Sequence, residues 1–412
     1  MSRRKTMRPA RGSGAARRRR AVRRHGLAAV LLTLTLAAPT HAAEPLYNEL
    51  ARAVVGAGQG VYVVAEDGTV LAAEAAARAV HPASVTKIAT TLALLERLGP
   101  DHRFTTRVLA GGDTDGATLR GDLVVAAGGD PFFVDEGAAA ILRRLHMLGL
   151  RQVTGRLIVR GMLLFDWQRD PEGRGLARAL AGAIPSWPTA PDWPPLGAAA
   201  LTFGGAAAPR PGSTPTPLVE YRSPPLLAIV KALNGYSNNV FHLAADAIGG
   251  AAAVEAAARA AVSPELRGEI VIANAAGAGT VNRISPRAAV ALLEALQRRL
   301  AGFDRDLTAV LPVSGIDPGT LRERLLTPPA GRGLVVGKTG TYGSQGASGL
   351  AGALRTARYG VVSFAILNRG LPVPEARRRQ DALVTGLAAA LGAEPWPYAA
   401  PAAPAFDQAE LR

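Results

Sequence analysis

The chain has 412 residues, of which 48% are hydrophobic and 19% are charged, so it is not disordered throughout and has room for one large domain with an insertion or for two domains. The formal net charge is +15, but residues 1–43 hold eleven basic residues and no acid, which leaves 36 basic against 32 acidic residues elsewhere. The absence of cysteine excludes a disulfide scaffold and a lipid-modified cysteine.

The N-terminal leader has the pattern of a secretory signal peptide. A basic stretch ends at Arg23-Arg24, an apolar segment runs from Leu27 to Ala38, and small residues follow, with a cut expected after Ala42. An apolar run this short seldom spans a bilayer. We therefore expect a signal peptide at 1–42, cleaved on export to the periplasm, and no stable membrane anchor afterwards. An uncleaved anchor and twin-arginine export remain the alternatives.

The first predicted elements are a hairpin and a helix. Residues 61–72 read as two extended runs around the turn Glu66-Asp67-Gly68. Apolar residues at helical spacing, 88, 92, 95 and 98, then run to the Gly99-Pro100 stop, which predicts a helix with Ser84 in its first turn.

Residues 106–215 differ in character from what precedes them. Strand-like runs at 123–126 and 157–159 flank a helical stretch at 137–148, and a segment rich in Pro, Trp and Gly follows at 185–217. We predict an inserted smaller domain at 106–215.

From residue 224 the pattern becomes helical again, including the alanine-rich 251–262, which predicts an all-helical part. Strands are expected at 334–336, 349–354 and 360–367, followed by a helix at about 375–391. Together these elements predict an α/β (α+β) fold, in which one antiparallel sheet built from both chain ends is covered by helices. The predicted catalytic domain is discontinuous, 43–105 and 216–393, and residues 394–412, rich in Ala and Pro, are expected to be a flexible tail.

Lysine is rare in this chain, with four lysines against 43 arginines. Lys87 closes a Ser-x-x-Lys motif with Ser84, and a spacing of three in a helix places both side chains on one face. A serine hydroxyl needs a base to become a nucleophile. A buried lysine can lose its proton and arginine cannot, which favours Lys87 as that base. The alternative is a helix-capping serine beside a solvated lysine.

Two further motifs follow in the chain. Tyr236-Ser237-Asn238-Asn239 offers a hydroxyl for proton relay in Ser237 and an amide for a substrate backbone in Asn239. Lys338-Thr339-Gly340-Thr341 follows an apolar strand and offers a cation and hydroxyls for a carboxylate, with Gly340 permitting close approach. Taken alone, the first motif is also typical of a loop, and the second of an exposed strand end. In this order, the three motifs together indicate one site.

The histidines after the leader show no metal-ligand spacing such as His-Glu-x-x-His, and we expect neither a metal nor a cofactor. Each histidine is expected to lie on the surface or in packing contacts. They are His81, His102, His146 and His242.

This motif set resembles that of the penicillin-recognising serine acyl-transferases. Within that group, four further short sequence segments resemble the D-alanyl-D-alanine carboxypeptidase/endopeptidase family of the penicillin-binding protein 4 type. The resemblance covers most of residues 45–392 and implies a β-lactamase/transpeptidase-like fold. The four segments are Gly121-Asp122-Leu123, Gly128-Gly129-Asp130-Pro131, Leu311-Pro312-Val313-Ser314-Gly315 and Leu350-Ala351-Gly352.

The resemblance implies a role for each motif residue. Ser84 would be the nucleophile, Lys87 its base, Ser237 a proton shuttle to the leaving amine, and Asn239 the holder of the substrate amide. Lys338, Thr339, Gly340 and Thr341 would bind the terminal carboxylate of a D-alanyl-D-alanine peptide. The N–H groups of Ser84 and Thr341 would form the oxyanion hole. The implied partners are peptidoglycan stem peptides and β-lactams.

The sequence departs from the family pattern at Ala276-Gly277-Ala278-Gly279, where the family has an Asp-Gly-Ser-Gly-like segment, and at His242-Leu243, near an expected Ala-Glu pair. No named catalytic group is lost. Three alternatives stay open: a non-catalytic peptidoglycan-binding or β-lactam-sensing protein, a β-lactamase-like serine esterase, and nucleic-acid binding. The last depends on retention of the leader, because the rest is nearly neutral with few aromatic residues. Oligomeric state and the balance between carboxypeptidase and endopeptidase activity do not follow from the sequence.

Overall fold

The computed structural model describes residues 45–182, 200–205, 214–326 and 331–412. The expected signal peptide at 1–42 and most of the segment rich in Pro, Trp and Gly at 185–217 lie outside the described residues.

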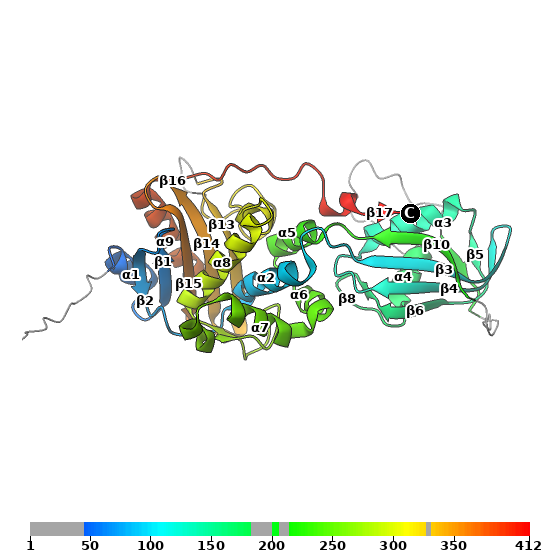
Figure 1. Cartoon of the computed structure of the whole chain (residues 1–412), viewed down its shortest axis with the longest axis horizontal. Helices are drawn as coiled ribbons and strands as arrows, with labels where there is room; N and C mark the ends of the chain where they lie inside the picture. Colours follow the sequence, from blue (N-terminus) through cyan, green and yellow to red (C-terminus); the bar gives the residue numbers. More distant parts are fainter. Residues whose placement is uncertain (1–44, 183–199, 206–213, 327–330) are drawn as a thin grey trace, which may run out of the picture. The chain divides into compact units, whose positions relative to one another are not determined.

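The first sheet is antiparallel and is built from both ends of the chain, as expected (Figure 1). Its order is β13-β14-β15-β1-β2, and β16 pairs with β14 beyond the end of β13. Its strands are β1 (Gly60–Val64), β2 (Val70–Glu74), β13 (Val335–Tyr342), β14 (Ala347–Thr356), β15 (Gly360–Arg369) and β16 (Ala393–Glu394). The predicted α+β fold class is confirmed.

Helices cover both faces of this sheet (Figure 1). On one face, α1 (Asn48–Val55) and α9 (Val373–Leu391) share a core with strand residues such as Leu350. On the other face, α2 (Lys87–Leu98) and α8 (Pro286–Ala301) share a core that includes Ala351. Neighbouring residues of β14 thus point into different cores, which explains why this central strand is apolar almost throughout instead of alternating.

Further helices pack around α2. They are α5 (Leu226–Tyr236), α6 (Phe241–Ala244) and α7 (Gly250–Ala261). The 3₁₀ turn η2 (Ala245–Ile248) joins α6 to α7, and η3 (Pro264–Glu269) follows α7. The small two-stranded pair β11 (Ile270–Val271) and β12 (Arg283–Ile284) brackets the glycine-rich segment between them. This helical part supplies the elements that surround Lys87.

A second, mixed sheet has its own core, with α3 (Asp135–Met147) and α4 (Arg174–Leu180) packed on it. The strands β3 and β4 form a long hairpin, and β5 and β6 run parallel to β4. Its strands are β3 (Thr105–Asp115), β4 (Thr118–Gly128), β5 (Gln152–Val153), β6 (Leu157–Met162), β9 (Thr202–Phe203), β10 (Thr216–Arg222) and β17 (Glu410–Leu411). A two-stranded pair, β7 (Leu164–Phe165) and β8 (Gln168–Arg169), follows β6 in the chain. The exact limits of the inserted domain stay a prediction.

The C-terminal segment differs from the expected flexible tail, because it is hydrogen-bonded at both ends. β16 pairs with β14 of the first sheet, and β17 pairs with β10 of the second. Between them Tyr398 donates its hydroxyl proton to Asp317 Oδ1 over 2.7 Å, and η6 (Ala405–Gln408) forms one turn. Alanine and proline lack the side-chain signals that would have predicted this pairing.

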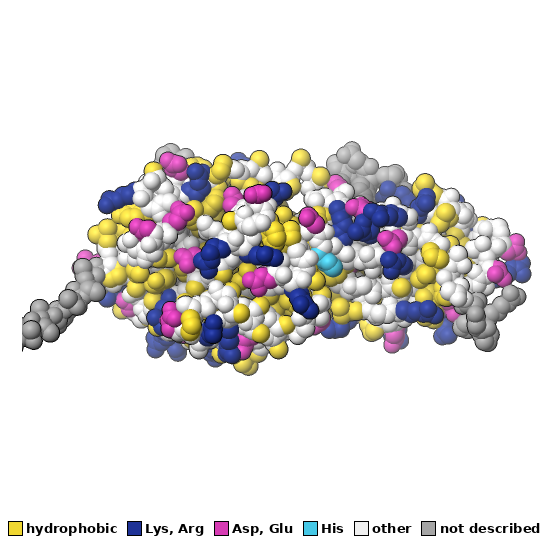
Figure 2. Space-filling view, viewed as in Figure 1, with side chains coloured by type: hydrophobic (Ala, Val, Ile, Leu, Met, Phe, Trp, Pro, Cys, Tyr) yellow, Lys and Arg dark blue, Asp and Glu magenta, His cyan; other side chains and the backbone are white. Residues whose placement is uncertain are grey.

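Charged side chains are mixed on the face of the molecule shown in Figure 2, where basic and acidic groups lie side by side. Elsewhere in the described residues too, charged side chains form ion pairs, such as Arg107 with Glu220 and Arg324 with Asp381. None of the helices within the described residues has the length and apolar character that a membrane span requires.

Candidate active site

Ser84 lies in the 3₁₀ turn η1 (Ala83–Thr86), which runs directly into α2. We expected it in the first turn of the α-helix itself, and the difference arises at Ala83, whose φ is +48°. This left-handed conformation is costly for alanine. It is held from both sides, since the Ala83 N–H donates to His81 Nδ1 over 3.1 Å and the Thr86 hydroxyl donates to Ala83 O over 2.9 Å. The turn thereby places Ser84 at the partly exposed start of a buried helix.

Lys87 is the first residue of α2 and is fully buried. Its Nζ lies 2.7 Å from Ser84 Oγ, 2.6 Å from the carbonyl oxygen of Ala276 and 3.3 Å from Asn239 Oδ1. No carboxylate is paired with it among the residues that the structure describes. Burial lowers the pKa of Lys87 to about 7, because a charged ammonium is poorly solvated there. The amine is therefore neutral in about half of the molecules at pH 7 and is suited to accept the Ser84 proton.

Ser237 ends α5 in a left-handed conformation, with φ of +56°. The helix is anchored just before this point, since Asn234 Nδ2 donates to Thr91 Oγ1 over 3.1 Å and to Val310 O over 3.0 Å. The turn that follows brings the Asn239 amide to Lys87. The second motif therefore joins the first through a direct hydrogen bond.

Lys338 completes the constellation from strand β13. Its Nζ is fully buried and donates to Ser237 Oγ and to the carbonyl oxygen of Thr339, both over 2.9 Å. Burial, and secondarily the positive charge of Lys87, lower the pKa of Lys338 well below its usual range. The predicted residues thus form two hydrogen-bonded groups, one of Ser84, Lys87 and Asn239 and one of Lys338 and Ser237.

Gly340 sets how closely β13 approaches the Ser84 turn. A Cβ at this position would lie 2.6 Å from Pro82 O and 3.1 Å from Ser84 N, so no side chain fits. The strand continues into Thr341, which pairs in register with Ser348 of β14. The absence of a side chain at 340 therefore lets the edge of β13 border the Ser84 amide.

The two threonines of this strand have partners that the sequence did not indicate. Thr339 Oγ1 donates to Thr320 Oγ1 over 2.8 Å, and Arg377 of α9 donates to Thr341 Oγ1 over 2.9 Å. Both partners are distant in sequence and carry no motif of their own.

The glycine-rich segment acts through its backbone. Ala276 O accepts from Lys87, and Asn274 Oδ1 accepts from the N–H groups of Ala276 and Ala278 over 2.9 and 3.1 Å. Asn282 Nδ2 links the segment to the Ser84 turn through Thr86 Oγ1, over 3.2 Å. The asparagines that flank this glycine-rich stretch are the sequence feature that could have indicated these contacts. Because the acceptor of the Lys87 bond is a backbone carbonyl, this contact does not depend on the side chain at position 276.

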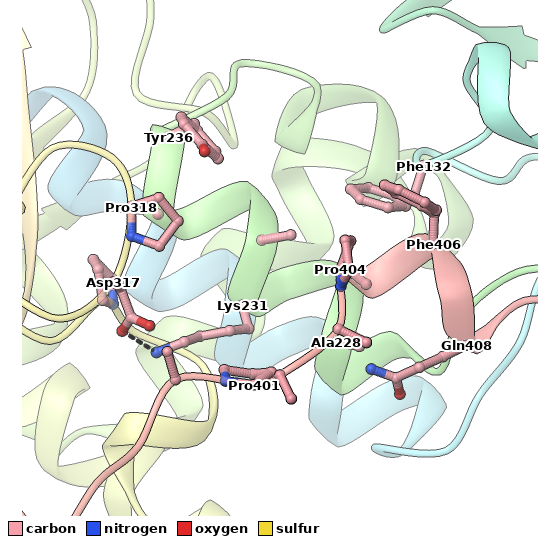
Figure 3. A pocket seen from close by; sticks show the side chains of 17 residues that line it. Phe132, Ala228, Lys231, Tyr236, Asp317, Pro318, Pro401, Pro404, Phe406 and Gln408 are labelled. Carbon is pink, nitrogen blue, oxygen red and sulfur yellow. Dashed lines mark hydrogen bonds and ion pairs between the residues drawn. The ribbon is translucent and has the colours of Figure 1, made fainter. Parts of the chain in front are cut away.

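A cavity of about 490 Å³ lies next to the site, between α5 and the C-terminal segment (Figure 3). It is lined by Tyr236 at the end of α5, by Pro401 and Pro404 of the C-terminal segment, and by Phe406. Lys231 and Asp317 form a buried ion pair of 2.6 Å on its wall. None of the candidate catalytic side chains lines this cavity, so we assign it no role in the reaction.

Two of the four histidines after the leader lie close to candidate site residues. His81 supports the Ser84 turn and stacks on Tyr342 with ring centroids 4.9 Å apart, and His242 bonds the carbonyl oxygen of Asn239 over 2.6 Å. Among the described residues, no group of three His, Asp or Glu side chains has the arrangement of a metal site.

Comparison with known proteins gives one family. A family model described as the D-Ala-D-Ala carboxypeptidase 3 (S13) family matches residues 45–171 and 203–390. A predatory endopeptidase from Bdellovibrio bacteriovorus, solved in complex with an immunity protein, is 21% identical with a TM-score of 0.67, over 85% of this chain and 98% of that chain. Penicillin-binding protein 4 from Haemophilus influenzae, solved with a β-lactam, is 18% identical with a TM-score of 0.63, over 84% of this chain and 99% of that chain. At these identities the structural likeness shows the shared fold.

Proposed function

Because the chain belongs to the D-Ala-D-Ala carboxypeptidase 3 (S13) family and is a serine peptidase, we propose that it cleaves D-alanyl-D-alanine peptides of peptidoglycan through an acyl-enzyme on Ser84. The observation that supports this most directly is the 2.7 Å contact between Ser84 Oγ and the buried Lys87 Nζ. Burial leaves this amine able to accept a proton near pH 7.

Acylation begins when neutral Lys87 takes the Ser84 proton and Oγ attacks the carbonyl carbon of the scissile amide. Negative charge then develops on the carbonyl oxygen, and the N–H groups of Ser84 and Thr341 are the proposed donors for it. The closeness of β13 to Ser84 N at Gly340 supports this pairing. Donors fixed in a water-poor site stabilise such an oxyanion by several kcal/mol.

The leaving amine must receive a proton as the carbon–nitrogen bond breaks. Ser237 is the proposed donor, because its hydroxyl is hydrogen-bonded to Lys338 and it precedes by two residues Asn239, whose Oδ1 accepts from Lys87. The proton that Lys87 took from Ser84 replaces the one that Ser237 donates, so Ser237 and Lys87 both return to their starting states. Water then attacks the ester of Ser84, with Lys87 again as the base, and releases the shortened peptide.

We place this reaction on peptidoglycan outside the cytoplasmic membrane, with β-lactams as covalent inhibitors. The relatives support this proposal, since penicillin-binding protein 4 from Haemophilus influenzae was solved with a β-lactam and an endopeptidase from Bdellovibrio bacteriovorus is named for peptidoglycan. The matching family model bears the name of a carboxypeptidase. We propose both terminal D-alanine release and cross-link cleavage as activities of the same site. A mature N-terminus at Ala43, measured by mass spectrometry after expression with its leader, tests the export step.

The central test is labelling with a fluorescent penicillin, together with D-alanine release from a pentapeptide. Ser84→Ala should abolish both, whereas the control Ser263→Ala, at an exposed serine, should behave as wild type. Labelling of Ser84→Ala would refute the proposed nucleophile. Labelling of the wild type without any D-alanine release would instead favour a β-lactam-sensing protein. Rapid hydrolysis of the penicillin would favour a β-lactamase-like esterase.

A further inference from the structure

Arg377 lies where the Lys-Thr-Gly-Thr strand meets solvent. It is an exposed residue in the second turn of α9, and its guanidinium donates to Thr341 Oγ1 over 2.9 Å. Its two neighbours on the helix, Arg378 and Arg379, both pair with Glu375. Within the described residues, Arg377 has no acidic partner within 4.0 Å. Its charge is therefore uncompensated at the edge of the candidate site.

The buried lysine of the same strand is poorly suited to pair with a substrate anion. Lys338 Nζ has no solvent exposure and is already bonded to Ser237 and to the Thr339 carbonyl. Burial and the nearby Lys87 charge favour its neutral form. A neutral amine donates a hydrogen bond, but it does not supply the charge that makes an ammonium–carboxylate contact strong. The expected cation of the motif is thus a weak source of charge for a carboxylate.

The two threonine hydroxyls of β13 also differ in how available they are to a substrate anion. Thr339 Oγ1 is hydrogen-bonded to Thr320 Oγ1 over 2.8 Å, so this hydroxyl already has a side-chain partner. Thr341 Oγ1 accepts from Arg377, which leaves its own proton available to a ligand. A hydroxyl that accepts from a guanidinium is polarised and donates more strongly to an anion. An anion bound to Thr341 would also be adjacent to the remaining N–H groups of Arg377.

We propose that Arg377 is a specificity-determining residue, which recognises the carboxylate on the leaving-group side of the scissile amide, directly and through the Thr341 hydroxyl. This inference rests on the proposed function, because it needs a substrate acylated at Ser84. It assigns anion recognition to an arginine of α9, and proton transfer to the buried lysines. A peptide with an amidated terminus would lose this contact. A peptide with a free carboxylate would keep it, whether that carboxylate is the chain terminus or lies on the α-carbon of a cross-linking diamino acid.

The test compares two thioester substrates with the same acyl-D-alanyl group, one with a thioglycolate leaving group and one with the corresponding carboxamide. Arg377→Ala should raise KM for the carboxylate substrate about 10- to 100-fold, as expected for loss of a charge-assisted contact, with kcat within about threefold. The carboxamide substrate should change less than about twofold in kcat/KM. Arg377→Lys should recover part of the loss for the carboxylate substrate only. The control Arg378→Ala removes a neighbouring exposed charge and should leave both substrates unchanged.

The outcomes separate this inference from the proposed function. Equal effects of Arg377→Ala on both substrates, or no effect on either, would overturn the role of Arg377 while the wild type still forms an acyl-enzyme. Absence of any turnover and any penicillin labelling in the wild type would overturn the proposed function itself, and this inference with it. A loss confined to the carboxylate substrate, with partial recovery in Arg377→Lys, would support both.

Discussion

Replacing Lys87 by arginine separates positive charge from proton transfer. With a pKa of about 7, roughly half of the Lys87 amines are neutral at pH 7. An arginine at this place has a reference pKa above about 12, so fewer than about one molecule in 10⁵ would present a neutral side chain. Loss of a general base slows a reaction by about 10²- to 10⁴-fold. We therefore expect Lys87→Arg to reduce the second-order rate of penicillin acylation by at least about 100-fold.

The assay is the time course of fluorescent-penicillin labelling at several drug concentrations, with thermal unfolding to verify that the variant is folded. The matched control is Lys231→Arg. Lys231 is also largely buried, but it is held by Asp317 at 2.6 Å, and its charged form is what that pair needs. The control should label within a few-fold of wild type. If Lys87→Arg labels within about tenfold of the wild-type rate, Lys87 is not the proton acceptor and the proposed mechanism is refuted.

Three further predictions follow from the same geometry. The acylation rate should rise about tenfold per pH unit below pH 7 and level off above it, because only neutral Lys87 accepts a proton; a rise that continues beyond pH 9 would contradict the lowered pKa. Gly340→Ala should slow labelling at least about 100-fold, since its Cβ would lie 2.6 Å from Pro82 O, whereas Gly343→Ala, with no atom within 4 Å, should match wild type in labelling and Tm. The buried Asp130 carboxyl has its pKa raised to about 7 by burial, so its neutral form favours the folded state, and this stability is present at low pH and is lost as pH rises toward 7. Between pH 5 and pH 8 the wild type should lose about 2 to 3 kcal/mol more unfolding free energy than Asp130→Asn in denaturant titrations, and parallel pH curves would show that Asp130 ionises normally.

The sequence predicted the parts of the site that depend on local spacing. A serine and lysine three residues apart at a helix start lie together in almost any helix, and the structure places Ser84 and Lys87 in contact. The apolar run at 334–336 likewise predicted a strand leading into Lys338, and the structure has β13 there, extended through Lys338 to Tyr342. These features repeat within one turn or one strand, so a local pattern is enough to indicate them.

The remaining contacts join segments far apart in the chain, and no local pattern encodes them. Ala276 contributes a carbonyl oxygen, which every residue type possesses, so its identity gives no signal. Thr320 and Arg377 become partners of Lys-Thr-Gly-Thr only because the loop before β13 and the helix α9 fold against that strand. The same reason applies to the C-terminal segment, where Glu410 and Leu411 find their pairing partners in β10, nearly two hundred residues earlier. Tertiary structure decided each of these positions.

Two of the four lysines of the chain, Lys87 and Lys338, are buried together in the candidate active site, where they influence each other's protonation. Charge on Lys87 lowers the pKa of Lys338, so protonation of one amine disfavours protonation of the other. When Lys87 accepts the Ser84 proton during acylation, the neighbouring Lys338 is therefore driven further toward its neutral state. Burial also makes the charged Lys87 ammonium poorly solvated, which favours transfer of its new proton toward the leaving amine through Ser237. A substrate carboxylate that relied on Lys338 for its charge would lose that partner as the reaction starts, whereas a guanidinium keeps its proton throughout. This coupling is the physical reason to expect anion recognition at Arg377.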